Sequence, residues 1–377
     1  LGYEISLTGN RGEWELTGYS RAQIEAFSQR RHDITQRLAD QGLSSAAAAQ
    51  IAAHQTRLTK DERTEAEMRQ EWQGRAQEQG LDLAQRTREA ALREPEPVLP
   101  EAQREAAQTA VTFAQEHITE REAVMHTRTL ETAALQRGMG KIVLEETRRE
   151  IAQQEQQGIL LPVTEGLWVG NGYTTREMVS LEHDILALLR TSQGQAQPLV
   201  AASSVEAWAR QKGLYTDQTQ VVVQTLSSRQ WLSAIEGKAG ATKTTTLGAM
   251  REILAANGHT VRGFGPTTGS VRALQEAGVE AKTVAALLAQ RLDPGSAKGA
   301  VWLVDESSLL ATRQVHALLH RAREAQVARV IFVGDQRQHG AVEAGRPIAQ
   351  LQAAGMEIAR LDIIRRQRDP ALRQAVE

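Results

Sequence analysis

The stretch EGKAGATKTTTL, residues 236–247, constrains the fold of this chain more than any other segment. It nearly matches the phosphate-binding loop pattern G-x-x-x-x-G-K-[ST], which requires a strand before it and a helix after it. The matching residues are Gly237, Gly240, Lys243 and Thr244. Thr242 departs from the pattern, because the position before the lysine is normally glycine.

The flanking sequence provides the context that such a loop needs. WLSAI before the loop is a strand candidate, and TTTLGAMREILAAN after it is a helix candidate. Backbone N–H groups and the helix N-terminus would hold phosphate oxygens. Lys243 would pair with the β- and γ-phosphates, the Thr244 hydroxyl would bind Mg²⁺, and Thr245 belongs to the same nucleotide-binding group. The loop therefore predicts ATP and Mg²⁺ as cofactors.

Thr242 leaves two interpretations open. Glycine allows the backbone to approach phosphates without a Cβ atom in the way, whereas threonine is β-branched and stiff. Either its side chain points away from the phosphates and the site works, or it crowds the site and slows turnover. We favour a working ATPase, because the other residues that the chemistry needs are all present in the chain.

A second motif supports the nucleotide site. VWLVDESS is a buried-strand run that ends in Asp305 and Glu306. Such a pair suits ATP hydrolysis, because the aspartate holds Mg²⁺ through water while the glutamate orients and deprotonates the attacking water. Two solvated carboxylates at a strand end are common, but this order and spacing after a phosphate loop are much rarer by chance.

Three further stretches narrow the class of protein. LYTDQTQVV places Gln218 before the loop, where a carboxamide can hydrogen-bond an adenine edge. VIFVGDQRQHG ends a strand and supplies Gln338, which can touch the γ-phosphate, its water or the metal. GFGPTTGSVRAL follows another strand and can hold a DNA backbone through hydroxyl and N–H groups. The predicted DNA-binding residues are Pro266, Thr267, Thr268 and Ser270.

The second half of the chain alternates strand-like apolar runs with helical stretches from Leu214 onward. This pattern predicts an α/β fold, a parallel sheet covered by helices on both faces. Aromatic residues make up only 4%, so aliphatic side chains must build most of the core. The net charge of −2 requires any nucleic-acid binding to use local basic patches. No run of about 18 apolar residues predicts a membrane span, and the chain has no cysteine.

The first half is mostly helical in pattern. YEISLTG and EWELTG flank NRG and predict a β-hairpin, and a helix capped by Ser20 follows. QEWQGRAQEQGLDL is interpreted as one helix, and REPEPVLPEA as an extended linker. Further helices precede two short strands, GILLPV and GLWVGNG, and a helix whose Thr174 and Glu177 have capping-box spacing. The order predicts a winged-helix-like domain that either binds DNA or braces a neighbour.

Taken in order, the motifs DQ, GKAGATKT, GPTT, DESS and GDQRQ resemble those of a superfamily 1 DNA helicase of the RecD type. IIRRQRDPALRQAVE resembles the next motif of that group and supplies Arg366, which would stabilise charge developing on the γ-phosphate. Together with VTFAQEHITEREAVM and the N-terminal LGYEISLTGNRGEWELTGYSRAQIEAFSQRR, the chain is similar to conjugative relaxase-helicases of the TraI/TrwC type.

The resemblance implies a protein that nicks plasmid DNA at the transfer origin and unwinds it 5′ to 3′ with ATP. It implies single-stranded DNA, relaxosome accessory proteins and a type IV secretion coupling protein as partners. The expected location is the donor cytoplasm, with export to the recipient and no membrane insertion. The expected domains are 1–33, the relaxase tail; 34–100, a helical and extended linker; 101–200, a winged-helix-like domain; 201–360, a RecA-like domain 1A; and 361–377, the truncated start of a second RecA-like domain.

Parts of that family's machinery are not expected here. The nicking tyrosine and three-histidine metal cluster cannot be mapped, and His316 and His320 are interpreted as helix-face residues rather than a metal pair. Because the later helicase motifs are absent, we expect these 377 residues alone to bind nucleotide weakly and hydrolyse it poorly. Two alternative functions remain open: a module that grips single-stranded DNA without turnover, and a RecD-like repair helicase.

Overall fold

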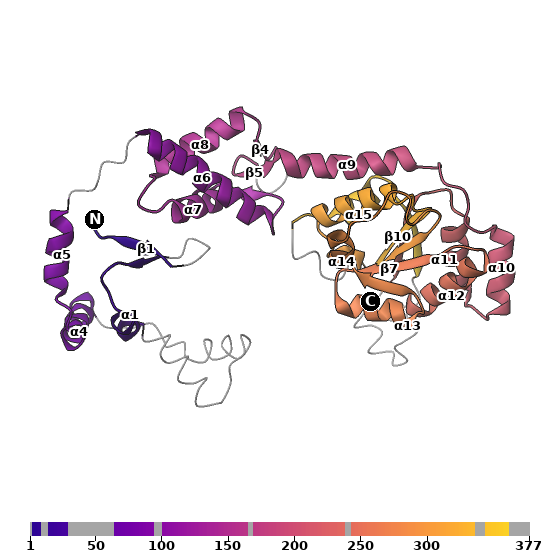
Figure 1. The fold of residues 1–377 in the computed structure, drawn as a ribbon, viewed down its shortest axis with the longest axis horizontal. Coiled ribbons are helices and arrows are strands. Elements are labelled where there is room, and N and C mark those ends of the chain that lie inside the picture. The colour runs from indigo at the N-terminus through magenta and orange to yellow at the C-terminus, as the bar shows by residue number, and fades with distance from the viewer. Residues whose placement is uncertain are drawn as a thin grey trace. The chain divides into compact units, whose positions relative to one another are not determined.

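The computed structural model describes residues 2–8, 14–28, 64–93, 100–164, 169–237, 243–335 and 344–361 (Figure 1). Its contacts divide the chain into two compact units. Leu1–Ala110 with Leu135–Glu146 form the first unit, and Val111–Ala134 with Thr147–Glu377 form the second. Within the described residues, no helix combines the length and hydropathy needed to cross a bilayer.

The first unit begins with the predicted hairpin. β1 (Ile5–Leu7) pairs antiparallel with β2 (Trp14–Leu16), so this prediction is confirmed. α1 (Arg21–Phe27) follows, and the Ser20 hydroxyl caps it by accepting from the Gln23 N–H, as predicted. Among the residues of this unit that the structure describes, the other helices lying wholly within it are α4 (Glu65–Glu78) and α5 (Leu83–Leu92).

One helix prediction in this unit was wrong. QEWQGRAQEQGLDL does not form a single helix, because α4 ends at Glu78 and α5 begins at Leu83. Gly80 adopts a positive φ of 66° between them, and the Asp82 side chain caps α5 by accepting from the Gln85 N–H. Glycine in a left-handed conformation and a capping aspartate are the usual signals of a helix break. The predicted linker REPEPVLPEA falls mostly outside the described residues, and its Pro100 begins α6.

Helices and a small antiparallel sheet follow. The helices are α6 (Pro100–Thr119), α7 (Thr127–Arg137), α8 (Leu144–Gln156) and α9 (Arg176–Ser192). The sheet has the order β3-β5-β4, with β3 (Met125–His126), β4 (Leu160–Pro162) and β5 (Gly172–Thr175). GILLPV thus contains a strand as predicted. The second strand begins only at Gly172, after a turn, and residues 166–168 of GLWVGNG lie outside the described part.

The cap of α9 also differs from the prediction by one residue. The Thr175 hydroxyl, rather than that of Thr174, accepts from the Met178 N–H. Thr174 instead donates its hydroxyl hydrogen to the Ala123 carbonyl at 2.8 Å. Two adjacent threonines offer the same local signal, and the tertiary contact to Ala123 decides between them.

The α/β lobe contains a six-stranded sheet with the order β11-β6-β10-β9-β7-β8, and every neighbouring pair is parallel. Its strands are β6 (Leu232–Gly237), β7 (Val261–Gly265), β8 (Glu280–Thr283), β9 (Val301–Val304), β10 (Arg329–Gly334) and β11 (Glu357–Leu361). WLSAI, VWLV and RVIFVG are therefore strands, as predicted from their apolar runs. Figure 1 shows these strands surrounded by helices.

Helices cover both faces of this sheet. One face packs on α9, α14 (Val284–Ala289), α15 (Thr312–Glu324) and α16 (Pro347–Ala353). The other packs on α10 (Ala202–Gln211), α11 (Thr216–Ser227), α12 (Lys243–Ala256) and α13 (Thr268–Glu276). Trp302 and Val304 of β9 enter the first core, whereas Val301 and Leu303 enter the second. This alternation explains why the strand is apolar throughout, and it confirms the predicted fold class.

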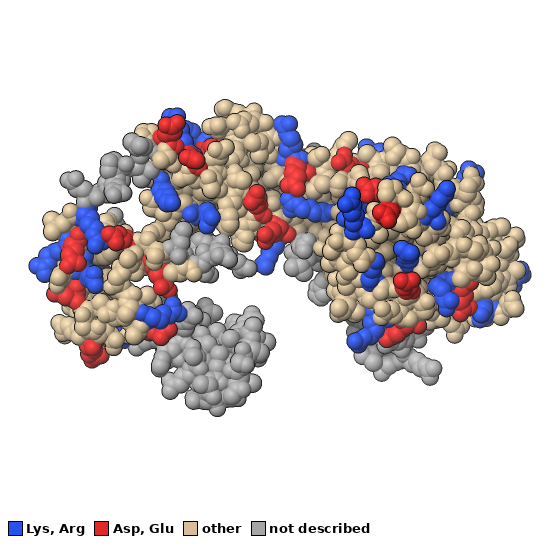
Figure 2. Space-filling view, viewed as in Figure 1, with Lys and Arg blue, Asp and Glu red and all other residues tan. Residues whose placement is uncertain are grey.

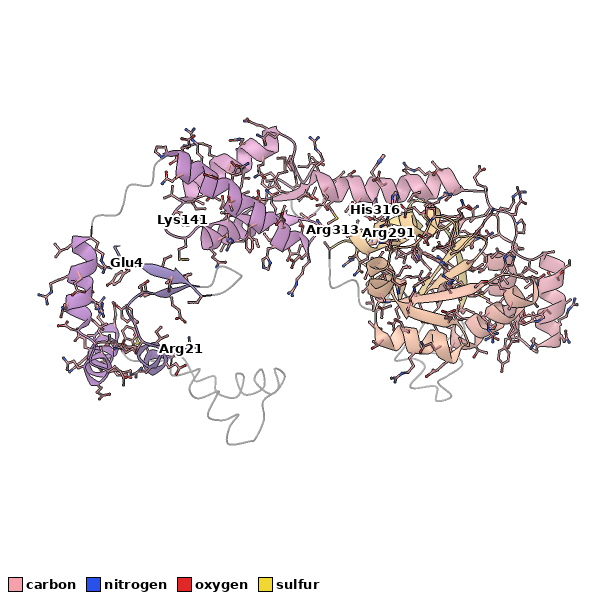
Figure 3. All side chains as sticks on the ribbon, viewed as in Figure 1. Glu4, Arg21, Lys141, Arg291, Arg313 and His316 are labelled. Carbon is pink, nitrogen blue, oxygen red and sulfur yellow. The ribbon has the colours of Figure 1, made fainter. Side chains whose placement is uncertain are left out.

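An arginine of α15 ties the lobe to the helices that precede it. The Arg313 guanidinium donates to both carboxylate oxygens of Glu177 at 3.1 and 2.8 Å, and to the Thr119 carbonyl at 3.0 Å. The bidentate bond lowers the pKa of Glu177. Figure 3 labels Arg313 and, on the same helix, His316. A planar guanidinium suits such a fork, so Arg313 fixes the start of α9 on α15.

The surface of the lobe carries both signs of charge. On the face shown in Figure 2, Lys and Arg residues are interspersed with Asp and Glu residues. This face therefore lacks the single-sign field that steers nucleic acid from a distance.

Candidate nucleotide site

The predicted motifs meet at one edge of the parallel sheet. Gly237 ends β6, Asp335 follows β10, Asp305 follows β9, and Gly265 ends β7. All four strands run in the same direction, so their carboxyl ends share this edge. β10 separates β6 from β9, which places the loop strand and the acidic strand about 10 Å apart at the usual strand spacing.

Lys243 is the first residue of α12 and lies at the end of β6. Its Nζ donates to the Gly237 carbonyl at 2.7 Å. A Cβ atom on Gly237 would come within 3.1 to 3.3 Å of Lys243 and Leu361, so glycine gives the lysine its room there. An ammonium has three donor hydrogens, so Lys243 can bind a phosphate oxygen at this strand end. Gly240 and Thr242 lie outside the described residues.

Thr244 and Thr245 are exposed on the first turn of α12, whereas Thr246 is fully buried. An open hollow of about 470 Å³ lies beside them. Trp208, Lys212 and Leu214 also line it, and the Lys212 ammonium lies 5.8 Å from the centre of the Trp208 ring. The hollow thus joins the phosphate end of α12 to an aromatic surface.

Asp305 is held rigidly at the end of β9 and is only 8% exposed. Its N–H donates to the Phe264 carbonyl at 2.9 Å, and its Oδ1 accepts from the Glu306 N–H at 2.9 Å. Burial raises the pKa of Asp305, while the Glu306 N–H and the positive charge of Lys243 act in the opposite direction. A buried carboxylate with a raised pKa gains most from a bound cation.

The donor set fits Mg²⁺ bound with a nucleotide. The Asp305 carboxylate and the Thr244 hydroxyl are oxygen ligands of the kind Mg²⁺ prefers. Among the described residues, no group of three or more histidines or carboxylates could hold a metal ion without help. Mg²⁺ commonly takes its other ligands from phosphate and water, so two protein oxygens suffice.

Glu306 follows Asp305 and has the left-handed backbone angles φ 49° and ψ 36°. Non-glycine residues adopt this region rarely and at some energetic cost. Its exposed carboxylate accepts a hydrogen bond from the Thr267 hydroxyl, with 3.1 Å between Oγ1 and Oε2. The GPTT stretch after β7 and the acidic pair after β9 are therefore in direct contact.

The GPTT residues divide into exposed and buried ones. Thr267 and Thr268 are exposed, Pro266 is half-buried, and Ser270 is only 1% exposed. Thr267 caps α13, because its Oγ1 accepts from the Ser270 N–H at 3.1 Å. A DNA strand can therefore reach the two threonines, while Ser270 supports the loop from within.

Gln218 occupies the third position of α11 and is 2% exposed. Its Oε1 accepts from the Tyr215 N–H at 3.2 Å, so it closes the start of this helix. Sequence reasoning missed this capping role, although the signal was present as a glutamine three residues after the helix boundary. Gln338 and Arg366 lie outside the described residues.

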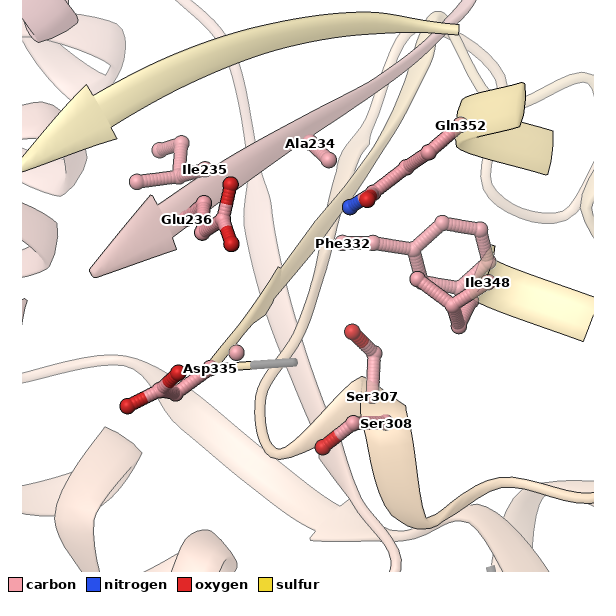
Figure 4. Close-up of a pocket in the computed structure, with 10 residues that line it drawn as sticks. Ala234, Ile235, Glu236, Ser307, Ser308, Phe332, Asp335, Ile348 and Gln352 are labelled. Atoms are coloured by element: carbon pink, nitrogen blue, oxygen red, sulfur yellow. The ribbon is translucent and has the colours of Figure 1, made fainter. Parts of the chain in front are cut away.

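The structure adds contacts that the sequence did not reveal. A crevice of about 10 Å³, room for roughly one water molecule, lies at the ends of β6 and β10 (Figure 4). Glu236, Ser307, Asp335 and Gln352 line it. The Ser307 hydroxyl donates to the Val333 carbonyl at 3.0 Å and fastens the turn after Glu306 to β10. The serines of DESS were the only sequence signal for this contact.

Two known protein families match different parts of the chain. The TrwC relaxase family matches residues 1–79, and an AAA domain family matches residues 213–377. Conjugal transfer protein TraA of Rhizobium radiobacter is 26% identical over 255 residues, which cover 67% of this chain and 22% of that protein. Multifunctional conjugation protein TraI of Escherichia coli is 28% identical over 244 residues, which cover 60% of this chain and 13% of TraI.

This chain is similar to the conjugal transfer proteins TraA and TraI over these stretches. It carries a TrwC relaxase segment and an AAA domain, so the resemblance to the TraI/TrwC type is confirmed. A probable TraA of Sinorhizobium fredii, 29% identical over 206 residues, shares 52% of this chain and 18% of its own length. The chain spans about a fifth or less of the length of these relatives.

A solved structure also resembles part of the chain. The crystal structure of Pif1 helicase from Candida albicans is 19% identical, covers 43% of this chain and 42% of its own, and has a TM-score of 0.33. That score is too low to carry an argument. The AAA domain match and the observed sheet establish a P-loop lobe of the RecA type, and such a lobe implies nucleotide binding.

Proposed function

We propose that this chain contains the ATP-dependent 5′–3′ DNA helicase or translocase of a plasmid conjugative relaxase. It would bind single-stranded DNA and unwind plasmid DNA after nicking at the transfer origin. The observation that carries the proposal is the meeting of Lys243, Asp305 and Glu306 at one sheet edge, with Thr267 bonded to Glu306. The direction of movement and the order of events come from the resemblance.

The residues divide the chemistry of ATP hydrolysis among them. Lys243 binds the β- and γ-phosphates, with Gly237 and Gly240 letting the backbone approach, and Thr245 lies on the nucleotide side of α12. Thr244 and Asp305 would hold Mg²⁺, which neutralises charge on the transferred phosphate. Glu306 takes the proton of the attacking water. The remaining proposed contacts are Gln338 and Arg366 at the γ-phosphate and Gln218 at the adenine.

The hollow beside Thr244 and Thr245 is the proposed place of the nucleoside. It adjoins Leu214, which leads into α11 and Gln218, and it offers the Trp208 ring as an apolar surface. A base can stack on such a ring while the phosphates lie at the helix N-terminus.

DNA contact is proposed at Pro266, Thr267 and Thr268, with Ser270 bracing their loop. Hydroxyl and N–H contacts of this kind bind the phosphate backbone and carry little sequence information. We also propose the winged-helix-like assignment of 101–200, the RecA-like assignment of 201–360, and 361–377 as the start of a second RecA-like domain. The proposed partners are the transfer origin, relaxosome accessory proteins and a secretion coupling protein, met in the donor cytoplasm before export.

ATP hydrolysis stimulated by single-stranded DNA tests this function. Lys243→Ala should lower the stimulated rate by about a hundredfold or more, because a charge that stabilises the transition state is lost. Lys298→Ala is the matched control, since Lys298 lies in the turn before β9, away from the site, and should keep the wild-type rate.

The other outcomes identify the alternatives. DNA binding without hydrolysis in the wild type would mean a module that only grips DNA. Hydrolysis that survives Lys243→Ala would mean that the loop at residues 236–247 is not the site of ATP hydrolysis. A RecD-like repair helicase is disfavoured by the TrwC relaxase match at residues 1–79.

A further inference from the structure

The contact between Thr267 and Glu306 joins two segments that would serve different ligands. Thr267 lies in the proposed DNA-binding stretch after β7, and Glu306 is the proposed base after β9. Their side chains meet at 3.1 Å, and both are exposed. The bond therefore lies where a ligand of either segment can change it.

The hydroxyl hydrogen of Thr267 has two acceptors within reach, Glu306 Oε2 and Ser270 Oγ, each 3.1 Å from Thr267 Oγ1. Thr267 Oγ1 donates to Glu306 Oε2 and accepts from the Ser270 N–H. Ser270 Oγ donates to the Thr267 carbonyl at 2.9 Å and accepts from the Thr267 N–H at 3.2 Å. A hydroxyl has a single hydrogen, so a new acceptor that takes it from Thr267 leaves Glu306 without this bond.

The strand order shows in which direction this bond holds Glu306. The phosphate loop follows β6, and the sheet order there is β6-β10-β9-β7. Thr267 follows β7, on the side of β9 away from β6. The bond thus draws the Glu306 carboxylate away from the phosphate loop. Glu306 itself has a left-handed backbone, with φ 49°.

We infer that Thr267 is a positioning residue that restrains Glu306 until single-stranded DNA engages the Thr267 hydroxyl. A DNA phosphate oxygen is a strong acceptor and competes for the same hydrogen. Once Thr267 donates to the phosphate, the Glu306 carboxylate is free to turn toward β10 and β6 and accept the proton of the attacking water. DNA binding and ATP hydrolysis are coupled by one hydrogen bond. The inference rests on the proposed function and specifies its regulation.

ATP hydrolysis without DNA is the deciding measurement. Thr267→Val keeps the shape of the side chain and removes the hydroxyl. It should raise the DNA-free kcat about fivefold, within the range of one ordinary solvent-exposed hydrogen bond, at unchanged KM for ATP. Saturating DNA should then add little. Thr267→Ser restores a hydroxyl and should restore low basal activity with strong stimulation.

A matched variant controls for the loss of a helix cap. Thr283 caps α14 at the end of the neighbouring strand β8, where its hydroxyl accepts from the Ala286 N–H at 3.1 Å. Thr283→Val removes a threonine cap of the same kind without touching Glu306, so both the basal and the stimulated rate should stay at wild-type values. A rise in basal rate in both valine variants would indicate a general loosening of the lobe and would overturn the inference.

The remaining outcomes separate this inference from the proposed function. Suppose that DNA stimulates the wild type, but that the DNA-free rate of Thr267→Val is no higher than the DNA-free rate of the wild type. Thr267 would then only contact DNA, and the inference that it restrains Glu306 would be refuted. A wild type that binds ATP but shows no hydrolysis with DNA would defeat the proposed function first, and the restraint with it.

Discussion

Arg329, the first residue of β10, carries a guanidinium that is buried completely. Nη1 donates to the Thr225 carbonyl at 3.3 Å, and Nη2 donates to the Gln197 and Ser228 carbonyls at 2.9 and 2.8 Å. Thr225 and Ser228 belong to the end of α11, where carbonyls lack partners within the helix and the helix dipole is negative. Arg329 therefore supplies both donors and positive charge at that point.

We predict that Arg329→Met lowers the free energy of unfolding by about 4 kcal/mol. Three hydrogen bonds from a charged donor contribute about 1.5 to 3 kcal/mol each, or about 5 to 9 kcal/mol together. Burial lowers the pKa of Arg329 from 12.5 to about 10. At about 1.4 kcal/mol per pKa unit, keeping this guanidinium charged in the buried site costs about 3.5 kcal/mol, a cost that methionine avoids. The difference is a net loss of about 1.5 to 5.5 kcal/mol.

Urea unfolding followed by tryptophan fluorescence measures this loss, because Trp231 and Trp302 lie in the core of the lobe. Arg360→Met is the matched control. Arg360 is in the same sheet, but its side chain is 61% exposed and pairs with Glu236 at 3.2 Å, so its loss should cost less than about 1 kcal/mol. For a lobe of this size, the Arg329 variant should also melt about 10 °C lower.

Equal stability of the two variants would refute the reasoning. It would mean that water or a rearranged loop satisfies the three carbonyls, or that the cost of burying the charge cancels its hydrogen bonds. An Arg329→Met protein more stable than the wild type would show that the cost of burial is the larger of the two.

Two further predictions concern pH and charge. Burial raises the pKa of Asp305, so the contribution of this carboxyl group to folding stability falls as pH rises through that pKa. Asp305→Asn should therefore raise the melting temperature at pH 7.5 while abolishing Mg²⁺-dependent ATP binding. An unchanged melting temperature would contradict this. Burial and the neighbouring His320 lower the pKa of His316, while Asp184 acts in the opposite direction. The unfolded chain therefore takes up a proton at this histidine more readily than the folded one, so folding stability should fall as pH drops below 6.5. His316→Gln should flatten that fall in urea titrations at pH 5.5 and 7.5, and an equal fall in both proteins would exclude His316 as its source.

Local patterns predicted much of the fold. The apolar runs at β6, β9 and β10, the helix after the loop and the N-terminal hairpin follow from hydrophobic periodicity and turn residues within a few positions of one another. The same patterns placed Lys243 in the loop between a strand and a helix, and Asp305 and Glu306 at a strand end. They were less reliable at boundaries. At Thr175 two adjacent threonines offered competing caps, and between α4 and α5 the break signalled by Gly80 and Asp82 was overlooked.

The sequence by itself determined which segments are strands, which residues end them, and the class of chemistry those residues suit. Only the tertiary structure decided that β10 lies between β6 and β9, that Thr267 holds Glu306, and that Arg329 closes α11. Strand order depends on how crossover helices pack over distances of many residues, and no short-range pattern encodes it. Hydrogen bonds between side chains of different strands depend on that order, because only neighbouring strands bring their ends within reach.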